Sequence, residues 1–136
     1  MSGKTFLDTN IVVYLYSGDE PEKRASALAL LELSNPVVST QVLSELANTL
    51  SRKFSLSFDV VAQAVAEVSD ACNVVPVMPD TIAQALALAQ KYRYSYYDSL
   101  ILAAAMSAGC ETLATEDMQQ GQTIEGSLTI RNPFEK

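Results

Sequence analysis

The stretch Lys4-Thr5-Phe6-Leu7-Asp8-Thr9-Asn10 is the most informative part of the sequence for the class of fold. Its short apolar segment ends in an acid, and residues 4–8 are therefore predicted to form a first β-strand. The apolar residues 10–16 that follow are predicted to form a short helix. A strand that leads directly into a helix is the beginning of a β-α unit, from which parallel sheets are built.

The rest of the chain continues this alternation of strand and helix. The further predicted strands cover residues 37–39, 73–78, 112–114 and 128–130. The further predicted helices cover residues 22–33, 40–53, 57–71, 80–91 and 95–108. Such alternation implies parallel strands joined by right-handed crossovers, with helices on both faces of the sheet. We therefore expect an α/β protein, a three-layer α/β/α sandwich with a central parallel sheet of four to five strands, in one domain that spans residues 1–136.

Two acids fall where such a sheet binds its ligands, which is outside the carboxyl ends of the strands. Asp8 directly follows the first predicted strand, and Asp117 comes just after the fourth. Each has a simpler explanation, since an Asp before a helix is often only an N-cap and a loop acid is often only surface. Glu116 is a rival of Asp117 for the same role.

Two further acids stand out because their surroundings are uncharged. Asp98 is the only charged residue between Tyr94 and Cys110, on a predicted helix that is apolar nearly all round. An acid on a buried helix has to be paired, protonated or bound to a metal, although capping of the helix also accounts for Asp98. Glu45 is the only charged residue between Thr40 and Leu50, but many mid-helix glutamates are simply solvated.

The composition limits the chemistry that these acids can perform. The chain has no histidine, which removes the usual general base and the usual zinc and iron ligands. The formal net charge of −7 argues against nucleic-acid binding, unless divalent ions neutralise a cluster of carboxylates. Simple solubility charge is the alternative explanation. A site with only oxygen ligands selects hard cations, Mg²⁺ or Mn²⁺, and Ca²⁺ less readily.

At four places the sequence resembles the motifs of PIN domains. The first is Phe6-Leu7-Asp8-Thr9-Asn10, and the second is Ser39-Thr40-Gln41-Val42-Leu43-Ser44-Glu45-Leu46. The third is Tyr97-Asp98-Ser99-Leu100-Ile101, followed by three alanines, and the fourth is Thr115-Glu116-Asp117. They occur in the order of the family and span nearly the whole chain. The size of the chain is similar to that of the compact bacterial VapC toxins of toxin–antitoxin pairs.

This resemblance implies a metal-dependent endoribonuclease. The acidic quartet carried over from the family is Asp8, Glu45, Asp98 and Asp117, which would hold Mg²⁺ or Mn²⁺ and serve catalysis, with Asp8 and Asp98 the expected direct ligands. The residues expected to support and orient these ligands are Thr9, Asn10 and Thr115, and Glu116 if Asp117 is the ligand. The resemblance also implies a toxin of a type II toxin–antitoxin system, with an RNA substrate, a cognate antitoxin protein and a homodimeric state.

The basic and aromatic residues are weaker candidates for contact with RNA. The basic candidates are Arg52, Lys53, Lys91 and Arg93, which equally suit the C-terminal dipoles of their helices. The aromatic candidates are Tyr94, Tyr96 and Tyr97, which suit stacking on bases or ordinary core packing. The sequence shows neither a signal peptide nor an apolar run of about 20 residues, so we expect a cytoplasmic protein without a membrane association.

Three other functions remain as alternatives. A PIN fold can act as a binding or regulatory protein with little or no nuclease activity. An aspartyl-phosphate phosphatase needs a second Asp two residues after the first, where this chain has Asn10. A receiver domain needs paired acids after the first strand and a lysine after the last, and neither is visible.

Overall fold

The structure is a computed structural model that describes residues 3–33 and 35–135. Its strands are β1 (Thr5–Leu7), β2 (Pro36–Ser39), β3 (Asn73–Val75), β4 (Thr112–Ala114), β5 (Thr123–Ile124) and β6 (Leu128–Arg131). Its helices are α1 (Thr9–Val13), the 3-10 turn η1 (Tyr14–Tyr16), α2 (Pro21–Leu31), α3 (Thr40–Arg52), α4 (Phe58–Ala71), α5 (Pro79–Tyr92) and α6 (Tyr96–Ser107). The domain expected over residues 1–136 also includes residues 1, 2, 34 and 136, which lie outside the described part.

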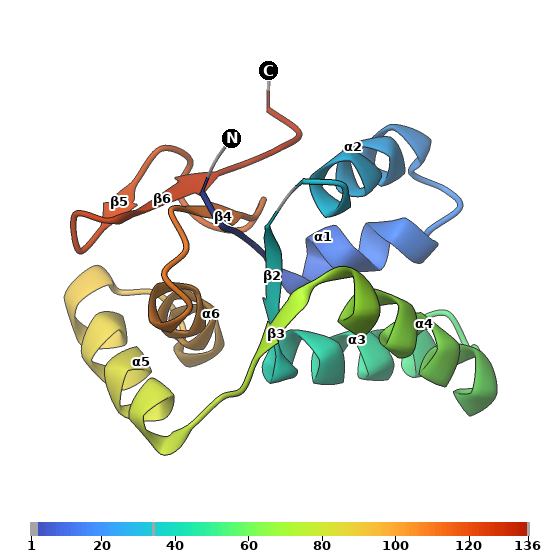
Figure 1. Cartoon of the computed structure of the whole chain (residues 1–136), viewed down its shortest axis with the longest axis horizontal. Helices are drawn as coiled ribbons and strands as arrows, with labels where there is room; N and C mark the ends of the chain where they lie inside the picture. Colours follow the sequence, from blue (N-terminus) through green and yellow to red (C-terminus); the bar gives the residue numbers. More distant parts are fainter. Residues whose placement is uncertain (1–2, 34, 136) are drawn as a thin grey trace.

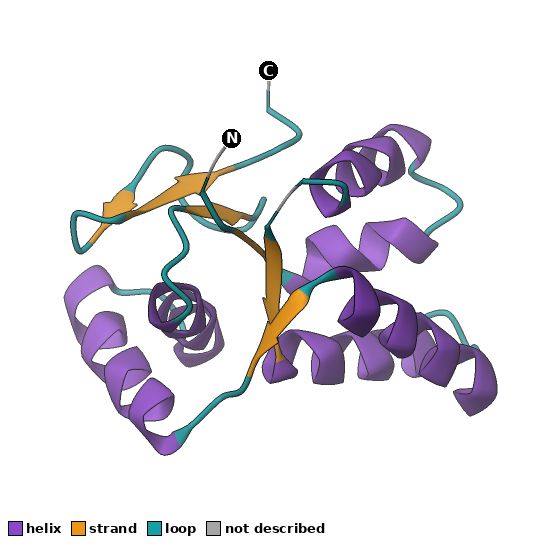
Figure 2. Cartoon of the chain, viewed as in Figure 1, coloured by secondary structure: helices purple, strands orange, loops and turns teal. Residues whose placement is uncertain are grey.

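The strands form one sheet in the order β3-β2-β1-β4-β6-β5 (Figure 2). All five strands expected from the sequence pair in parallel, with β1 between β2 and β4. The sixth strand, β5, pairs antiparallel with β6 and was not predicted. With only two residues, β5 is too short to show an alternating pattern of apolar and polar side chains.

Helices cover both faces of this sheet, as expected for a three-layer α/β/α sandwich. Figure 1 shows α1 to α4 on one side of the sheet and α5 with α6 on the other. Because both faces are covered, the central strand β1 is buried at all three of its residues. The carboxyl ends of β1 and β2 lead directly into α1 and α3, and these junctions bring the N-terminal turns of the two helices to one edge of the sheet.

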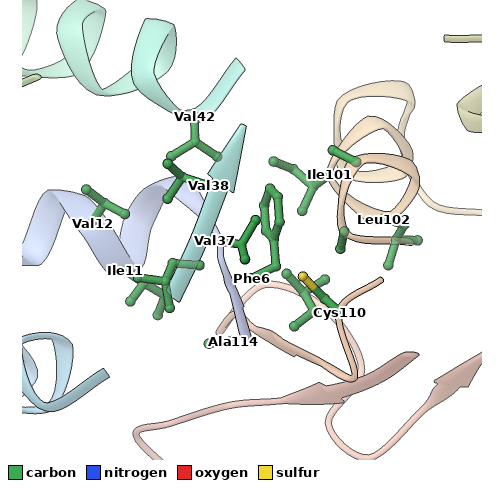
Figure 3. Packing of buried hydrophobic residues seen from close by; sticks show 14 of the residues in the cluster. Phe6, Ile11, Val12, Val37, Val38, Val42, Ile101, Leu102, Cys110 and Ala114 are labelled. Carbon is green, nitrogen blue, oxygen red and sulfur yellow. The ribbon is translucent and has the colours of Figure 1, made fainter. Parts of the chain in front are cut away.

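The core continues through the sheet from one helical layer to the other. Figure 3 shows Phe6 and Val37 facing Ile101 of α6, whereas Val38 faces Val42 of α3 on the opposite side. The helix α6 is buried from Ser99 to Ala105, which confirms the prediction made from its apolar sequence. It therefore holds its first turn, which carries Asp98, in a fixed position relative to β1.

Several boundaries differ from those predicted, each for a local reason. The helix expected over residues 10–16 begins at Thr9 and tightens into the 3-10 turn η1. The strand expected over residues 73–78 ends at Val75, because Pro76 has no N–H for the ladder and the Val77 N–H donates to Thr40 Oγ1 at 3.0 Å. The strand β3 lies at the edge of the sheet, where the proline had suggested it would be.

Candidate active site

The four acids singled out from the sequence line one cleft of about 710 Å³. Asp8 follows β1 and caps α1, and Asp117 lies in the loop after β4. Glu45 comes from the second turn of α3, and Asp98 comes from the first turn of α6. Four separate parts of the chain therefore meet at one edge of the parallel sheet.

Asp8 forms the floor of this cleft and is only 7% exposed. Its carboxylate accepts hydrogen bonds from the Thr9 N–H and from Thr115 Oγ1, both at 2.7 Å. Burial raises the pKa of Asp8 to about 6, and although these hydrogen bonds oppose the increase, repulsion from Asp117 and Asp98 adds to it. An acid with this raised pKa is held in an environment that favours its neutral form or a nearby cation.

Glu45 is connected to Asp8 through a single residue. Thr9 donates its backbone N–H to Asp8 and its hydroxyl to Glu45 Oε1 at 2.6 Å. The other oxygen of Glu45 accepts from Gln41 Nε2 at 3.4 Å. Glu45 is thus oriented into the cleft by hydrogen bonds and does not extend into solvent as an ordinary mid-helix glutamate would.

Asp98 stands in the first turn of α6, where Ser95 caps the helix and accepts from the Asp98 N–H at 3.2 Å. Burial raises the pKa of Asp98, and repulsion from Asp117 and Glu45 contributes to the increase. The repulsions felt by Asp8 and Asp98 together involve all four acids. The quartet is therefore one electrostatic unit.

The structure places Asp117, and not Glu116, on the cleft. Asp117 accepts from Asn10 Nδ2 at 3.0 Å, and its N–H donates to Thr115 Oγ1 at 3.1 Å. Glu116 instead accepts from the Tyr14 hydroxyl and forms an ion pair with Lys23 at 3.0 Å. These contacts occupy both oxygens of Glu116, so that of the two candidate acids Asp117 is the one that lines the cleft.

Besides Thr9 and Asn10, five uncharged side chains line the cleft, and the sequence analysis did not assign four of these five a role. Gln41, Ser44, Asn48 and Thr49 lie on α3, and Tyr97 lies on α6 beside Asp98. On α3, Gln41, Asn48 and Thr49 lie three or four residues from Glu45, and Ser44 directly precedes it. Such spacing puts them on the helical face of Glu45, which is the sequence signal that would have found them.

None of the basic residues expected to contact RNA lines the cleft. Lys91 is paired with Glu125 at 2.6 Å, and Arg93 follows α5 in a left-handed conformation with φ of 67°. Arg52 ends α3, and Lys53 borders a smaller hollow that shares Asn10 with the cleft. Of the other tyrosines considered, Tyr94 binds Gln122 and the Gln119 N–H, and the half-buried Tyr96 packs edge-on against Tyr97.

The donor set of the cleft fits a hard divalent cation. Its strong ligands are carboxylate oxygens, and the described residues that line it include no nitrogen or sulfur ligand. Over residues 3–33 and 35–135, no three acids or cysteines already have the close arrangement of a finished metal site. A bound cation would have to draw the carboxylates together and would offset the repulsion that contributes to the raised pKa of Asp8 and Asp98. In the same part of the chain, every helix is too short or too polar to cross a bilayer.

The fold and the cleft define an α/β protein with an acidic site at the carboxyl edge of its parallel sheet. A sequence model of the PIN domain family matches residues 5–123. The chain therefore belongs to the PIN domain family, as its four motifs predicted. A search among curated proteins gave no significant sequence match.

Solved structures with the same fold come from several bacteria. A chain of a toxin–antitoxin complex from Klebsiella pneumoniae is 24% identical, with a TM-score of 0.73 over 98% of this chain and 100% of its own. The sarcin-ricin loop cleaving toxin VapC20 of Mycobacterium tuberculosis is 23% identical, with a TM-score of 0.68 over 84% of this chain and 90% of its own. A chain of the FitAcB structure from Neisseria gonorrhoeae is 19% identical, with a TM-score of 0.70 over 97% of this chain and 99% of its own. These similarities confirm the fold.

Proposed function

We propose that this protein is a metal-dependent endoribonuclease that hydrolyses RNA phosphodiester bonds. The observation that carries the proposal is the meeting of Asp8, Glu45, Asp98 and Asp117 in one cleft. Membership of the PIN domain family supports it, as does the similarity to a structure described as a sarcin-ricin loop cleaving toxin.

The carboxylates of the quartet would hold Mg²⁺ or Mn²⁺ at the carboxyl edge of the sheet. Such a cation, when bound, makes water a better nucleophile near neutral pH and stabilises the charge that develops on phosphate oxygens. Asp8 and Asp98 would be the direct ligands, as the family motifs suggest, with Asp8 buried and Asp98 partly buried at the cleft. Thr9, Thr115 and Asn10 keep the carboxylates aimed into the cleft through the hydrogen bonds described above. Asp117 or Glu45 would accept a proton from the attacking water.

Cleavage of labelled RNA by the purified chain tests this proposal. We expect cleavage with Mn²⁺ or Mg²⁺, none with EDTA, and a loss of more than about 100-fold in Asp98→Asn, since even a residue that only supports a ligand is worth about 10–100-fold. The matched control is Asp59→Asn, because Asp59 occupies the first turn of α4 but lies outside the cleft. Equal cleavage by wild type and Asp98→Asn would remove Asp98 from the mechanism, and no cleavage by the wild type would leave a binding or regulatory protein as the better description.

We further propose that this nuclease is the toxin of a type II toxin–antitoxin system. One structurally similar chain comes from a structure described as a toxin–antitoxin complex, and two others come from structures described as VapBC2 and VapBC-1. Induced expression should arrest bacterial growth, Asp98→Asn should not, and co-expression of a small protein encoded next to the gene should restore growth. Growth arrest by both the wild type and Asp98→Asn would show that toxicity does not depend on the nuclease activity.

A homodimer is the assembly that we propose. The side chains of Met78, Ile82 and Leu86 are 53%, 40% and 50% exposed and follow one another every four residues, so they form an apolar stripe along α5. In analytical sedimentation, the wild type should behave as a dimer and Leu86→Glu as a monomer. This result would support burial of the stripe between two copies of the chain.

A further inference from the structure

Asp117 differs from the other three acids of the quartet in lying on an irregular loop. Residues 115–122, which we call the Asp117 loop, join β4 to β5 without forming a helix or strand, and Asp117 is exposed on it. On the side of β4 the loop is held by Glu116, which contacts Tyr14 and Lys23. Because neighbouring carboxylates repel Asp117, the loop also needs a contact on the side of β5 to keep one position.

Tyr94 provides this second contact. Its hydroxyl accepts from the Gln119 N–H at 3.0 Å and donates to Gln122 Oε1 at 2.5 Å. The Gln122 N–H in turn donates to the Gln119 carbonyl at 3.2 Å, so the hydroxyl binds both ends of one tight turn. The half-buried ring of Tyr94 packs against the hydrophobic core, which holds the hydroxyl in a fixed place. The Asp117 loop is therefore anchored two residues after Asp117.

Tyr94 also directly precedes the helix that carries Asp98. The next residue, Ser95, is the N-cap of α6, and its hydroxyl accepts from the Asp98 N–H at 3.2 Å. Since α6 is buried from its second turn onward, this end of the helix cannot shift easily. The Tyr94 hydroxyl thus joins the segment of Asp98 to the loop of Asp117, and the charges of these two acids repel each other.

We propose that Tyr94 is a positioning residue that fixes Asp117 relative to Asp98 for a divalent cation. This inference rests on the proposed nuclease function and its cation. Tyr94 does not line the cleft, so it acts through the Asp117 loop and touches neither the cation nor the RNA. A loop that is already fixed loses less conformational freedom when the cation binds, which strengthens the binding.

A second tyrosine in the same segment makes the same kind of contact away from the acids. The Tyr92 hydroxyl accepts from the Glu125 N–H at 2.9 Å and donates to Glu125 Oε2 at 2.8 Å. Glu125 lies in the turn between β5 and β6, which carries none of the four acids. Like Tyr94, Tyr92 is half-buried against the core. Tyr92→Phe is therefore a matched control for Tyr94→Phe.

The affinity of the full chain for Mn²⁺ tests the proposal, with free Mn²⁺ measured by electron paramagnetic resonance. Tyr94→Phe keeps the ring and loses both hydrogen bonds, so the Kd for Mn²⁺ should rise by about three- to ten-fold. Tyr92→Phe should have the Kd of the wild type. An unchanged Kd in Tyr94→Phe, or an equal rise in both variants, would overturn the proposal.

Hydrogen exchange of the Gln119 amide gives a measurement that needs no cation. In EDTA, this amide should exchange at least about three-fold faster in Tyr94→Phe than in the wild type, because its acceptor is gone. An unchanged exchange rate would show that the hydroxyl does not hold the loop.

A double variant tests whether the effect passes through the Tyr94 hydroxyl. Gln122→Leu removes the acceptor of that hydroxyl and should also weaken Mn²⁺ binding. Added to Tyr94→Phe, it should cause no further loss, because the two substitutions break the same hydrogen bond. If the two losses multiplied in full, the coupling through this hydroxyl would be wrong.

Thermal unfolding separates positioning from general stability. Each phenylalanine variant loses two hydrogen bonds, so both should lower Tm by similar amounts, whereas only Tyr94→Phe should lose affinity for Mn²⁺. At saturating Mn²⁺, cleavage of RNA by Tyr94→Phe should approach the rate of the wild type, because the bound cation then holds the Asp117 loop.

The outcomes distinguish this inference from the proposed function. If the wild type cleaves RNA and Tyr94→Phe needs no more Mn²⁺ than the wild type, the positioning role is wrong and the nuclease stands. If the wild type binds Mn²⁺ without cleaving RNA, the proposed function fails, and weaker Mn²⁺ binding by Tyr94→Phe would still support the positioning role. A wild type that binds no Mn²⁺ would overturn both.

Discussion

At the scale of single residues, two threonines organise the acidic quartet. Thr115 donates its hydroxyl to Asp8 and accepts from the Asp117 N–H, while Thr9 donates its N–H to Asp8 and its hydroxyl to Glu45. Thr9 therefore joins the carboxylates of Asp8 and Glu45, whereas Thr115 joins the carboxylate of Asp8 to the backbone of Asp117. The hydrogen bonds that the two threonines donate to Asp8 offset part of the cost of burying its charged carboxylate.

Removal of the Thr9 hydroxyl should reduce activity without unfolding the protein. Thr9→Val keeps the N–H that binds Asp8 but loses the hydrogen bond to Glu45, so cleavage should fall by about 10–100-fold. Thr9→Ser retains the hydroxyl and should keep most of the activity. Initial cleavage rates at saturating Mn²⁺ measure the effect, and equal rates for the two variants would contradict the role given to the hydroxyl.

The raised pKa of Asp8 predicts a pH dependence of stability. The pKa of Asp8 is about 6 in the folded protein against an ordinary value of 3.8, so the folded state binds the proton more tightly. In EDTA, the contribution of this carboxyl to the free energy of unfolding is therefore greatest below pH 3.8, decreases as the pH rises, and is lost above pH 6, by about 3 kcal/mol in total.

Asp8→Asn removes this ionisation and tests the sign of the effect. At pH 7.5 in EDTA, the variant should be about 1–3 kcal/mol more stable than the wild type, even though it is inactive. Near pH 4 the difference should largely disappear. Denaturant titrations at the two pH values measure it, and a variant less stable than the wild type at pH 7.5 would refute the cost assigned to the charged carboxylate.

At the scale of elements, the loop after β4 is held by contacts to α1, η1 and α2. Lys23 of α2 binds Glu116 at 3.0 Å and the Tyr14 hydroxyl at 3.2 Å, and it lies over the rings of Tyr14 and Phe134. Hydrogen bonds to Glu116 and Tyr14 raise the pKa of Lys23, which therefore stays charged. This cluster fastens Glu116, so that the next residue, Asp117, faces the cleft.

Lys23→Met should loosen the loop and weaken the cation site. We expect the Mn²⁺ concentration needed for half-maximal cleavage to rise several-fold, because Asp117 is positioned less well. Lys91→Met removes the comparable ion pair with Glu125, away from the cleft, and should leave this concentration unchanged. The double variant Lys23→Glu with Glu116→Lys exchanges the two charges and should restore part of the affinity for Mn²⁺. If Lys91→Met raised the required Mn²⁺ concentration as much as Lys23→Met, the effect would come from net charge and not from the position of Asp117.

At the scale of the whole molecule, the parallel sheet converts four distant segments into one site. The order β3-β2-β1-β4-β6-β5 puts β1 beside both β2 and β4, so the loops and helices that follow these three strands share one edge. The apolar α6 packs across this sheet and brings Asp98 to the same edge. The acidic cleft is therefore a product of the topology and of the burial of α6.

A divalent cation should stabilise the whole fold through this cleft. Mn²⁺ at 100 times its Kd should add about 2.7 kcal/mol to the free energy of unfolding and raise Tm by roughly 10 °C. The increase should be absent in Asp8→Asn, which has lost a ligand. Differential scanning calorimetry with Mn²⁺ and with EDTA measures both, and an equal rise in Asp8→Asn would assign the stabilisation to general charge screening.

The sequence by itself determined the α/β class, the five parallel strands and the four acids, because these are recorded in local patterns. Along the chain, short apolar segments typical of strands alternate with longer segments that have the apolar spacing of helices. An acid such as Asp98 stands out within an apolar helix. The helix boundaries were also close, since caps such as Ser95 act on residues only three positions away.

Only the tertiary structure decided which neighbouring acid faces the cleft and that β5 closes the edge of the sheet. Glu116 and Asp117 are equivalent in sequence, and they are separated by partners such as Lys23, 93 residues away. Asp8 and Thr115 meet across 107 residues. Such contacts depend on how the sheet and helices pack, so they cannot be predicted from the local preferences of the chain.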